Sequence, residues 1–293
     1  MSQTYSSFTL PRLITEPIVR AALLEDLGRA GDITTDAVVP VTAEAECAII
    51  ARDPGVISGV DLACLAFAMM DPSVAISVMR PDGSTVAAGE TVLQISGSAR
   101  AILCAERVAL NLLCHLSGIA TATADLVEAV RSHGHARIVC TRKTTPGLRA
   151  LEKAAVRAGG GANHRFGLDD AILIKDNHIA IAGGVRIAIE RARAMAGHLI
   201  KIEVEVDRLD QLDEALAVGV DAVLLDNMDI STLAEAVRRT GKRAVTEASG
   251  RVTLKTAPAM AATGVDLISA GWLTHSAPIL DLGLDVAAPL RPM

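Results

Sequence analysis

The chain has 293 residues, of which 51% are hydrophobic and 21% charged, and its formal net charge at pH 7 is -6. A composition this apolar excludes a disordered chain. The acidic balance argues against a general nucleic-acid or membrane-surface binder, because both surfaces are negatively charged and attract basic proteins. Aromatic residues make up only 2% of the chain, so the core must be aliphatic. An aliphatic core favours parallel strands covered by helices.

Cysteine spacing and the lack of targeting signals favour a cytoplasmic protein. The five cysteines contain no C-x-x-C pair, which argues against a disulfide framework and against a zinc knuckle. The first residues lack the basic and apolar regions of a secretory signal, and no apolar run approaches the ~20 residues of a membrane span. We therefore expect a cytoplasmic protein whose partners include neither nucleic acid nor membranes.

The first part of the sequence predicts a small layer of strands and helices. Three segments have the pattern of β-strands: 45–52, 73–80 and 91–95. The apolar stretch 60–70 is typical of a helix. A long segment rich in Ala and Leu, 99–131, favours helix as well, with an interruption expected at Ser117-Gly118.

From residue 136 onward, strand patterns alternate with helix patterns. Six segments are predicted strands: 137–141, 171–175, 200–206, 222–226, 244–247 and 267–270. Amphipathic helices are expected between most of them, for example over 209–218. This rhythm predicts parallel β/α units.

Charged and glycine-containing motifs lie where these predicted strands end. In chain order they are Arg142-Lys143, Lys175, Glu203 with Glu205, Asp226, Glu247-Ala248-Ser249-Gly250 and Gly271. The carboxyl ends of the strands in a β/α barrel face one mouth, so these positions should converge on one pocket. Between residues 142 and 178 there are seven Lys and Arg against four Asp and Glu, which indicates a multiply anionic substrate.

Individual motifs suggest particular tasks within such a pocket. Thr145-Pro146 is a predicted helix start. Backbone N–H groups in the Ser249-Gly250 and Ser269-Ala270-Gly271 turns can cradle a phosphate. Glu205 and Asp226 can bind ribose hydroxyls or Mg²⁺, whereas Glu203 receives no role beyond the wall of the site.

Several longer motifs carry a family resemblance along most of the chain. They are LLEDLGRAGDITT (23–35), ERVALNLLCHLSGIAT (106–121), TRKTTPGLRALEKAAVRAGGGANHRFGL (141–168), LIKDNHI (173–179), EVEV (203–206), LLDNM (224–228), EASG (247–250) and ISAGWLTHSA (268–277). On these motifs the sequence resembles the type II phosphoribosyltransferases, and within them quinolinate phosphoribosyltransferase, the carboxylating nicotinate-nucleotide pyrophosphorylase.

The resemblance implies a fold and an assembly. The expected fold class is α/β, with an N-terminal α/β sandwich domain (1–116), an incomplete parallel α/β barrel (117–275) and a tail (276–293) that packs back on the first domain. The expected assembly is a homodimer with shared active sites, or a higher oligomer, in which Arg107 reaches the site of the neighbouring subunit.

The resemblance also implies the reaction and the roles of the site residues. Quinolinate and phosphoribosyl pyrophosphate would be the substrates and Mg²⁺ the cofactor. The quinolinate carboxylates and part of the pyrophosphate would be surrounded by Arg142, Lys143, His164, Arg165 and Lys175. Glu205 and Asp226 match the ribose and metal positions. The phosphate loops contain Ser249, Gly250 and Gly271. Thr141 and Ser269 complete the substrate-binding set, and the expected catalytic residues are Lys143, Glu205 and Asp226.

One departure and three alternatives accompany this interpretation. Arg251 follows Gly250 where similar sequences commonly have a smaller residue, which affects the expected detail of that phosphate loop. The alternatives are the molybdenum-transport-associated relative of the family, a non-catalytic binding module for a phosphorylated metabolite, and a generic phosphosugar barrel enzyme. The TRKTTPGLR and GGGANHR stretches favour the quinolinate enzyme over the first alternative, and the retained charges at Arg142, Lys175, Glu205 and Asp226 argue against the second. The third leaves the cluster of basic residues unexplained.

Overall fold

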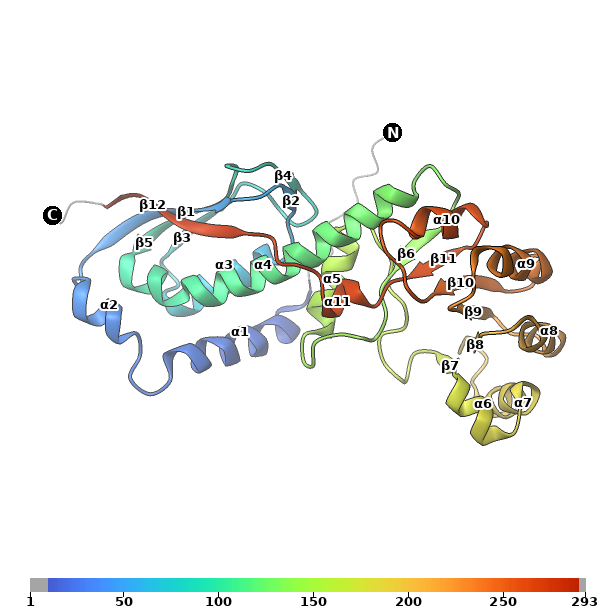
Figure 1. Cartoon of the computed structure of the whole chain (residues 1–293). Helices are drawn as coiled ribbons and strands as arrows, with labels where there is room; N and C mark the ends of the chain where they lie inside the picture. Colours follow the sequence, from blue (N-terminus) through green and yellow to red (C-terminus); the bar gives the residue numbers. More distant parts are fainter. Residues whose placement is uncertain (1–9, 290–293) are drawn as a thin grey trace. The chain divides into compact units, whose positions relative to one another are not determined.

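The computed structural model describes residues 10–289 (Figure 1), and its elements group into two units. The first unit contains the chain up to Ala122, Thr145–Gly160 and the segment from Ser276 on. The second contains Thr123–Thr144 and Gly161–His275. Residues 145–160 thus join the first unit, although they lie inside the predicted barrel segment. The domain boundaries proposed from the sequence stay a prediction.

The first unit is built on an antiparallel sheet with helices beside it. Its strands are β1 (Glu44–Ala51), β2 (Gly55–Val56), β3 (Ala75–Val78), β4 (Thr85–Val86), β5 (Thr91–Ser98) and β12 (Leu282–Pro289). Its helices are α1 (Arg12–Leu27), α2 (Ile33–Val38), α3 (Val60–Met70), α5 (Arg149–Ala158) and most of α4 (Ala99–Val130). The main sheet has the order β12-β1-β5-β3, and β2 pairs with β4 separately. Exposed and buried residues alternate along β1, because successive side chains of a strand point to opposite faces.

Strand β12 completes the main sheet at the side of β1. The two strands pair antiparallel, with Ala51 opposite Leu282 and Ala45 opposite Pro289. More than 200 residues separate the two strands in sequence. An exposed ion pair between Arg52 and Asp285, which are 233 positions apart, also links the two segments. No local pattern in the sequence predicted this strand.

The interruption predicted at Ser117-Gly118 is wrong, because α4 is continuous from Ala99 to Val130. Gly118 instead allows close packing, since a Cβ atom there would lie 2.1 Å from the backbone oxygen of Pro278. Ser117 is buried, and its hydroxyl accepts a hydrogen bond from the backbone N–H of Ser58. By length and composition α4 could cross a membrane, but 67% of its most apolar window is buried within the protein, as in the core helix of a soluble protein.

All six strands predicted for the second half form the parallel sheet of the second unit. They are β6 (Arg137–Val139), β7 (Ile172–Ile174), β8 (Ile202–Val206), β9 (Ala222–Asp226), β10 (Val245–Ser249) and β11 (Leu267–Ser269). The helices are α6 (Asp176–Ala182), α7 (Val185–Met195), α8 (Leu209–Val218), α9 (Ile230–Thr240), α10 (Ala257–Ala262) and α11 (Trp272–His275). The order is β6-β11-β10-β9-β8-β7, and the neighbouring strands pair in parallel. The predicted fold class is confirmed: α/β, with an antiparallel first sheet and a parallel second one.

The register of this sheet decides which side chains share a face. Glu205 lies opposite Leu224, and Leu224 lies opposite Glu247. Because strand side chains alternate between faces, residues two positions further along each strand share that face too. The opposite face is apolar and fully buried, as at Val204 and Val223, and α7, α8 and α9 pack against the strands.

Candidate functional site

A pocket of about 660 Å³ lies at the carboxyl ends of the strands in the second unit. Twelve of the predicted site residues line it: Thr141, Arg142, Lys143, His164, Arg165, Lys175, Glu205, Asp226, Ser249, Gly250, Ser269 and Gly271. Their convergence follows from the parallel sheet, in which every strand delivers its carboxyl end to the same edge. Their individual roles stay predictions.

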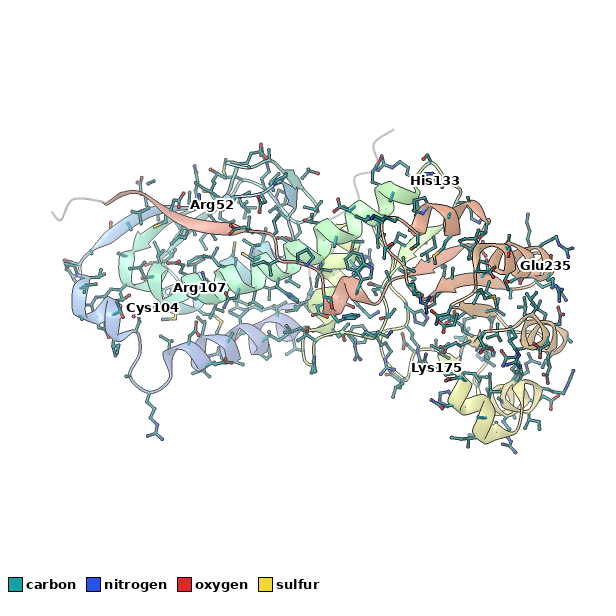
Figure 2. All side chains as sticks on the ribbon, viewed as in Figure 1. Arg52, Cys104, Arg107, His133, Lys175 and Glu235 are labelled. Atoms are coloured by element: carbon teal, nitrogen blue, oxygen red, sulfur yellow. The ribbon has the colours of Figure 1, made fainter. Side chains whose placement is uncertain are left out.

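Arg107 is the predicted site residue that is not among the described residues lining this pocket. It lies on α4 in the first unit (Figure 2), where its side chain is exposed. Its guanidinium donates a hydrogen bond of 2.7 Å to the side-chain oxygen of Asn111, one turn further along the helix. An exposed arginine held in this way is available to another molecule.

Two arginines form the cationic wall of the pocket. Arg142 and Arg165 are both half-buried, and the Nε atom of each is buried without a hydrogen-bond partner among the described residues. Arg165 donates one hydrogen bond from Nη1 to the backbone oxygen of Ala171. Burial, and then the Arg142 guanidinium, lower the pKa of Arg165 from its ordinary value. Two adjacent cations with unsatisfied donors favour an anionic ligand between them.

The segment that carries Arg165 enters the site along the edge of β6. Ala162 forms a parallel bridge with Val139, and its N–H donates to the oxygen of Ile138 at 2.8 Å. This pairing extends the sheet by one short segment and leads directly to His164 and Arg165. The pairing of Ala162 with the edge of β6 therefore determines where His164 and Arg165 lie in the pocket.

A pair of carboxylates lies on neighbouring strands of the same face. Glu205 of β8 forms an ion pair with Lys175, which follows β7 and is labelled in Figure 2. Asp226 ends β9, and one of its oxygens accepts a hydrogen bond of 2.6 Å from the side-chain amide of Asn227. Two carboxylates from adjacent strands provide hard oxygen ligands in a pocket open to phosphate oxygens, a combination that fits Mg²⁺.

The turn after β10 has an unusual backbone. Gly250 has a φ of +94°, and a Cβ atom there would lie 2.2 Å from the side-chain oxygen of Asn227. Asn227 and Arg251 also have positive φ values, 54° and 52°, which non-glycine residues rarely adopt. This glycine therefore lets the turns after β9 and β10 approach closely, and Arg251 lies in the pocket wall beside it.

The turn around Gly271 is equally tight. A Cβ atom there would lie 2.9 Å from Cδ of Lys143 and 3.4 Å from Oγ1 of Thr141. The hydroxyl of Thr274 donates to the backbone oxygen of Lys143 at 2.7 Å, and the N–H of Lys143 donates to Thr141. The loop after β6 is thus fixed against the turn after β11, which orients Lys143.

The helix start predicted at Thr145-Pro146 is wrong. Helix α5 begins at Arg149, after a turn in which the N–H of Leu148 donates to the oxygen of Thr145. The N–H of Thr145 donates instead to the carboxylate of Glu152, which is fully buried. A tertiary contact thereby replaces the local cap that the sequence pattern indicated.

Several residues of the pocket received no individual role from the sequence. Glu247, which the sequence placed among the converging strand ends, lines the pocket, and so do Asn227, Trp272 and His275, which the sequence did not place there. Glu247 lies two positions before Ser249 on β10, so strand alternation alone could have placed both on one face. Trp272 donates from Nε1 to the backbone oxygen of Val252 at 2.9 Å, a long-range contact with no local signal.

Sequence comparisons match this chain to two domain families in succession. The quinolinate phosphoribosyl transferase N-terminal domain matches residues 32–117, and the quinolinate phosphoribosyl transferase C-terminal domain matches residues 119–285.

Individual proteins are similar over nearly the whole chain. The nicotinate-nucleotide pyrophosphorylase (carboxylating) of Mycobacterium leprae is 48% identical over 276 residues, covering 92% of this chain and 95% of that protein. A probable enzyme of the same name from Bacillus subtilis is 45% identical and covers 90% of both chains. The solved structure of the nicotinate-nucleotide pyrophosphorylase from Francisella tularensis is 37% identical with a TM-score of 0.91, covering 97% of this chain and 100% of that one.

Proposed function

Because the chain belongs to the quinolinate phosphoribosyltransferase family, we propose that its pocket joins quinolinate to phosphoribosyl pyrophosphate with loss of carbon dioxide. The products are nicotinate mononucleotide, pyrophosphate and CO₂, as in the de novo synthesis of NAD. The observation that carries this assignment is the half-buried pair Arg142 and Arg165, whose Nε atoms lack partners among the described residues. Quinolinate is a dicarboxylate, and arginine binds carboxylates through two parallel hydrogen bonds.

The remaining residues suit the other substrate. Lys143 and Lys175 supply compact positive charges for the pyrophosphate, and the turns at Ser249-Gly250 and Ser269-Gly271 supply backbone N–H groups for a phosphate. Thr141 holds the loop that carries Lys143. In this proposal the pocket separates the dicarboxylate near the arginines from the ribose and its phosphates near β9 to β11.

The chemistry requires positioning more than a nucleophilic side chain. The pyridine nitrogen attacks the anomeric carbon while the bond from that carbon to pyrophosphate breaks. Positive charge then develops on the ribose ring, and the carboxylates of Glu205 and Asp226 stabilise it. The 2-carboxylate leaves as CO₂, and the ring carbon takes up a proton. The positive charge of the ring nitrogen stabilises the electron pair left after CO₂ departs.

Glu205 and Asp226 would also hold Mg²⁺, which supplies positive charge for the departing pyrophosphate. The fit rests on the two carboxylates of adjacent strands at the mouth of the pocket. Few protein ligands are needed, because Mg²⁺ usually keeps waters and substrate phosphate oxygens in its shell. We propose a cytoplasmic location, in keeping with the five free cysteines.

The proposed reaction is tested with the purified protein, quinolinate, phosphoribosyl pyrophosphate and Mg²⁺. We expect nicotinate mononucleotide and CO₂ in equal amounts, and neither when any addition is left out. The readout is chromatography for the nucleotide together with release of labelled CO₂. If a folded sample yields neither product, the quinolinate assignment fails, and the molybdenum-transport-associated relative or a binding module becomes the better explanation.

A homodimer with shared sites accounts for Arg107. We propose that this exposed arginine completes the pocket of the neighbouring subunit, where it adds a further cation for quinolinate. Arg107→Ala and Arg142→Ala should each be nearly inactive. Mixed after subunit exchange, they should recover about a quarter of wild-type activity, because half of the dimers contain both variants and each of these has one intact site. Subunit exchange is measured independently, by native mass spectrometry of the mixture with an affinity tag on the Arg107→Ala chain. No recovery in the first mixture, with exchange demonstrated, would refute the shared site.

A further inference from the structure

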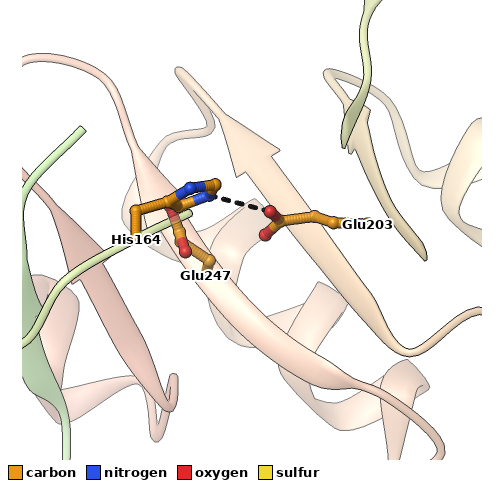
Figure 3. Close-up of side chains that lie close together, drawn as sticks. All are labelled: His164, Glu203 and Glu247. Atoms are coloured by element: carbon orange, nitrogen blue, oxygen red, sulfur yellow. Dashed lines mark hydrogen bonds and ion pairs between the residues drawn. The ribbon is translucent and has the colours of Figure 1, made fainter. Parts of the chain in front are cut away.

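One histidine and two glutamates form a cluster (Figure 3), and two of its members, His164 and Glu247, line the pocket, whereas Glu203 is not among the described residues that line it. His164 comes from the loop after α5, Glu203 from β8 and Glu247 from β10. The side chains of His164 and Glu203 are each 12% exposed, and that of Glu247 is 2% exposed. In the sheet order β9 lies between β8 and β10, so the imidazole spans two strands that do not pair with each other.

The hydrogen bonds of His164 define its tautomer. Its Nδ1 accepts a hydrogen bond of 2.8 Å from the backbone N–H of Arg165. An accepting Nδ1 carries no proton, so Nε2 must carry it. Nε2 lies 2.9 Å from a carboxylate oxygen of Glu203 and donates to it. The ring is therefore neutral, and both of its nitrogens already have partners within the protein.

We propose that His164 is a positioning residue, held as the neutral tautomer between Glu203 and Glu247, which fixes Arg165 in the pocket without contacting the substrate itself. This inference rests on the proposed function, since it assigns the quinolinate contact to Arg165. The contact from the Arg165 N–H to the ring, and from the ring to β8, ties the backbone of Arg165 to the sheet. A fixed backbone lowers the entropy that the arginine would lose on binding an anion.

The same geometry bears on the charge of Glu247. Its Oε1 atom is buried without a hydrogen-bond partner among the described residues and lies 3.8 Å from Nε2 of His164. Burial, and then the charge of Glu203, raise the pKa of Glu247 to about 7, although a hydrogen bond with Ser269 favours the charged form. Glu247 thus holds a proton below neutral pH. The two glutamates of the cluster then carry one negative charge between them instead of two near Arg165.

A double-mutant cycle distinguishes positioning from direct contact. Quinolinate affinity is measured by calorimetry without the second substrate, so that no turnover occurs. We expect His164→Ala and Arg165→Ala each to weaken binding, and the double variant to bind no more weakly than Arg165→Ala alone, because His164 acts through Arg165. If the two losses instead multiply in a folded double variant, His164 contacts quinolinate itself and the proposal is wrong.

Glu247→Gln is a second test that does not disturb the ring. Glutamine mimics the protonated glutamate, so at pH 6 this variant should bind quinolinate within twofold of wild type. As pH rises through 7, wild-type Glu247 loses its proton, adds a negative charge beside a dianionic ligand and weakens binding by about 10-fold. Glu247→Gln has no carboxyl proton to lose there, so its quinolinate affinity should not fall by this factor as pH rises through 7.

Several titratable and apolar groups surround Glu247. Glu203 faces Glu247 from β8 and His164 faces it from the loop, whereas the residues opposite Glu247 on β9 and β11 are Leu224 and Leu267. His275 is a further titratable group that lines the pocket. The test is therefore the difference between wild type and Glu247→Gln, with the exposed Glu190→Gln as control.

Three results would overturn the inference. Equal pH dependence in wild type and Glu247→Gln would show that Glu247 does not change its charge there. The three ligand atoms lie within 4.8 Å of one another, so a stoichiometric transition metal in the wild type that Glu247→Gln loses would show a metal site instead. If the losses of quinolinate affinity in His164→Ala and Arg165→Ala multiply in the double variant, His164 does not act through Arg165. If wild type binds no quinolinate at all, the proposed function fails, which is a separate outcome.

Discussion

Replacing Arg142 with alanine should weaken quinolinate binding by about 30-fold or more, because truncating one partner of a desolvated charge pair typically costs about 2–5 kcal/mol. The reason lies in the unliganded pocket, where Arg142 and Arg165 stand close enough for the one cation to lower the pKa of the other. Their Nε donors lack partners among the described residues, so an anion gains hydrogen bonds that the free protein does not make. Calorimetric titration with quinolinate measures the loss.

The same substitution should leave the free protein no less stable. Removing Arg142 removes the repulsion of a like charge from Arg165, so the thermal midpoint without ligand should stay unchanged or rise, while the stabilisation by quinolinate disappears. Arg186→Ala, an exposed arginine whose ion-pair partner is Glu190, serves as the control for loss of a positive charge. Unchanged quinolinate affinity in Arg142→Ala would remove this residue from the carboxylate site.

Asp226→Asn should lower kcat by about 100- to 1,000-fold, the range typical for loss of one electrostatic contact made in the transition state. Asp226 ends β9 opposite Ser249, on the face that carries Glu205, and in the proposed mechanism its negative charge would stabilise the developing ribose cation and hold Mg²⁺. Asparagine keeps the size of the side chain. We expect the Mg²⁺ concentration for half-maximal rate to rise, whereas quinolinate affinity without Mg²⁺ should change little.

A matched control lies at the same end of the sheet. Asp207 follows β8 directly but is not among the described residues that line the pocket. Its side chain is 66% exposed, so Asp207→Asn removes an equivalent charge outside the site. If the two variants had the same kcat and the same Mg²⁺ dependence, Asp226 would be neither a metal ligand nor a stabiliser of the ribose.

The sequence alone determined the six strands of the second sheet and the place where their functional residues meet. Short aliphatic runs separated by amphipathic helices are local signals, and parallel connection follows from them. Once the strands are parallel, Arg142, Lys175 and Asp226 must arrive at one edge, whatever the details of packing. Quinolinate itself followed from the family motifs and not from composition or spacing.

Only the tertiary structure decided the features that depend on contacts between distant segments. Gly118 does not break α4, because the chain near Pro278 packs against it. Thr145 does not cap α5, because the carboxylate of Glu152 takes its N–H. Strand β12 forms because β1 offers an open edge.

The cluster of His164, Glu203 and Glu247 has the same origin. Its members come from three places in the chain, and no local pattern relates the loop histidine to either strand. The register of β8, β9 and β10 places the two glutamates on one face, and the segment beside β6 brings the imidazole between them. The alternation of residues within one strand determines which of its side chains lie on the same face of the sheet. The contacts between side chains of different strands depend instead on how all the strands pair.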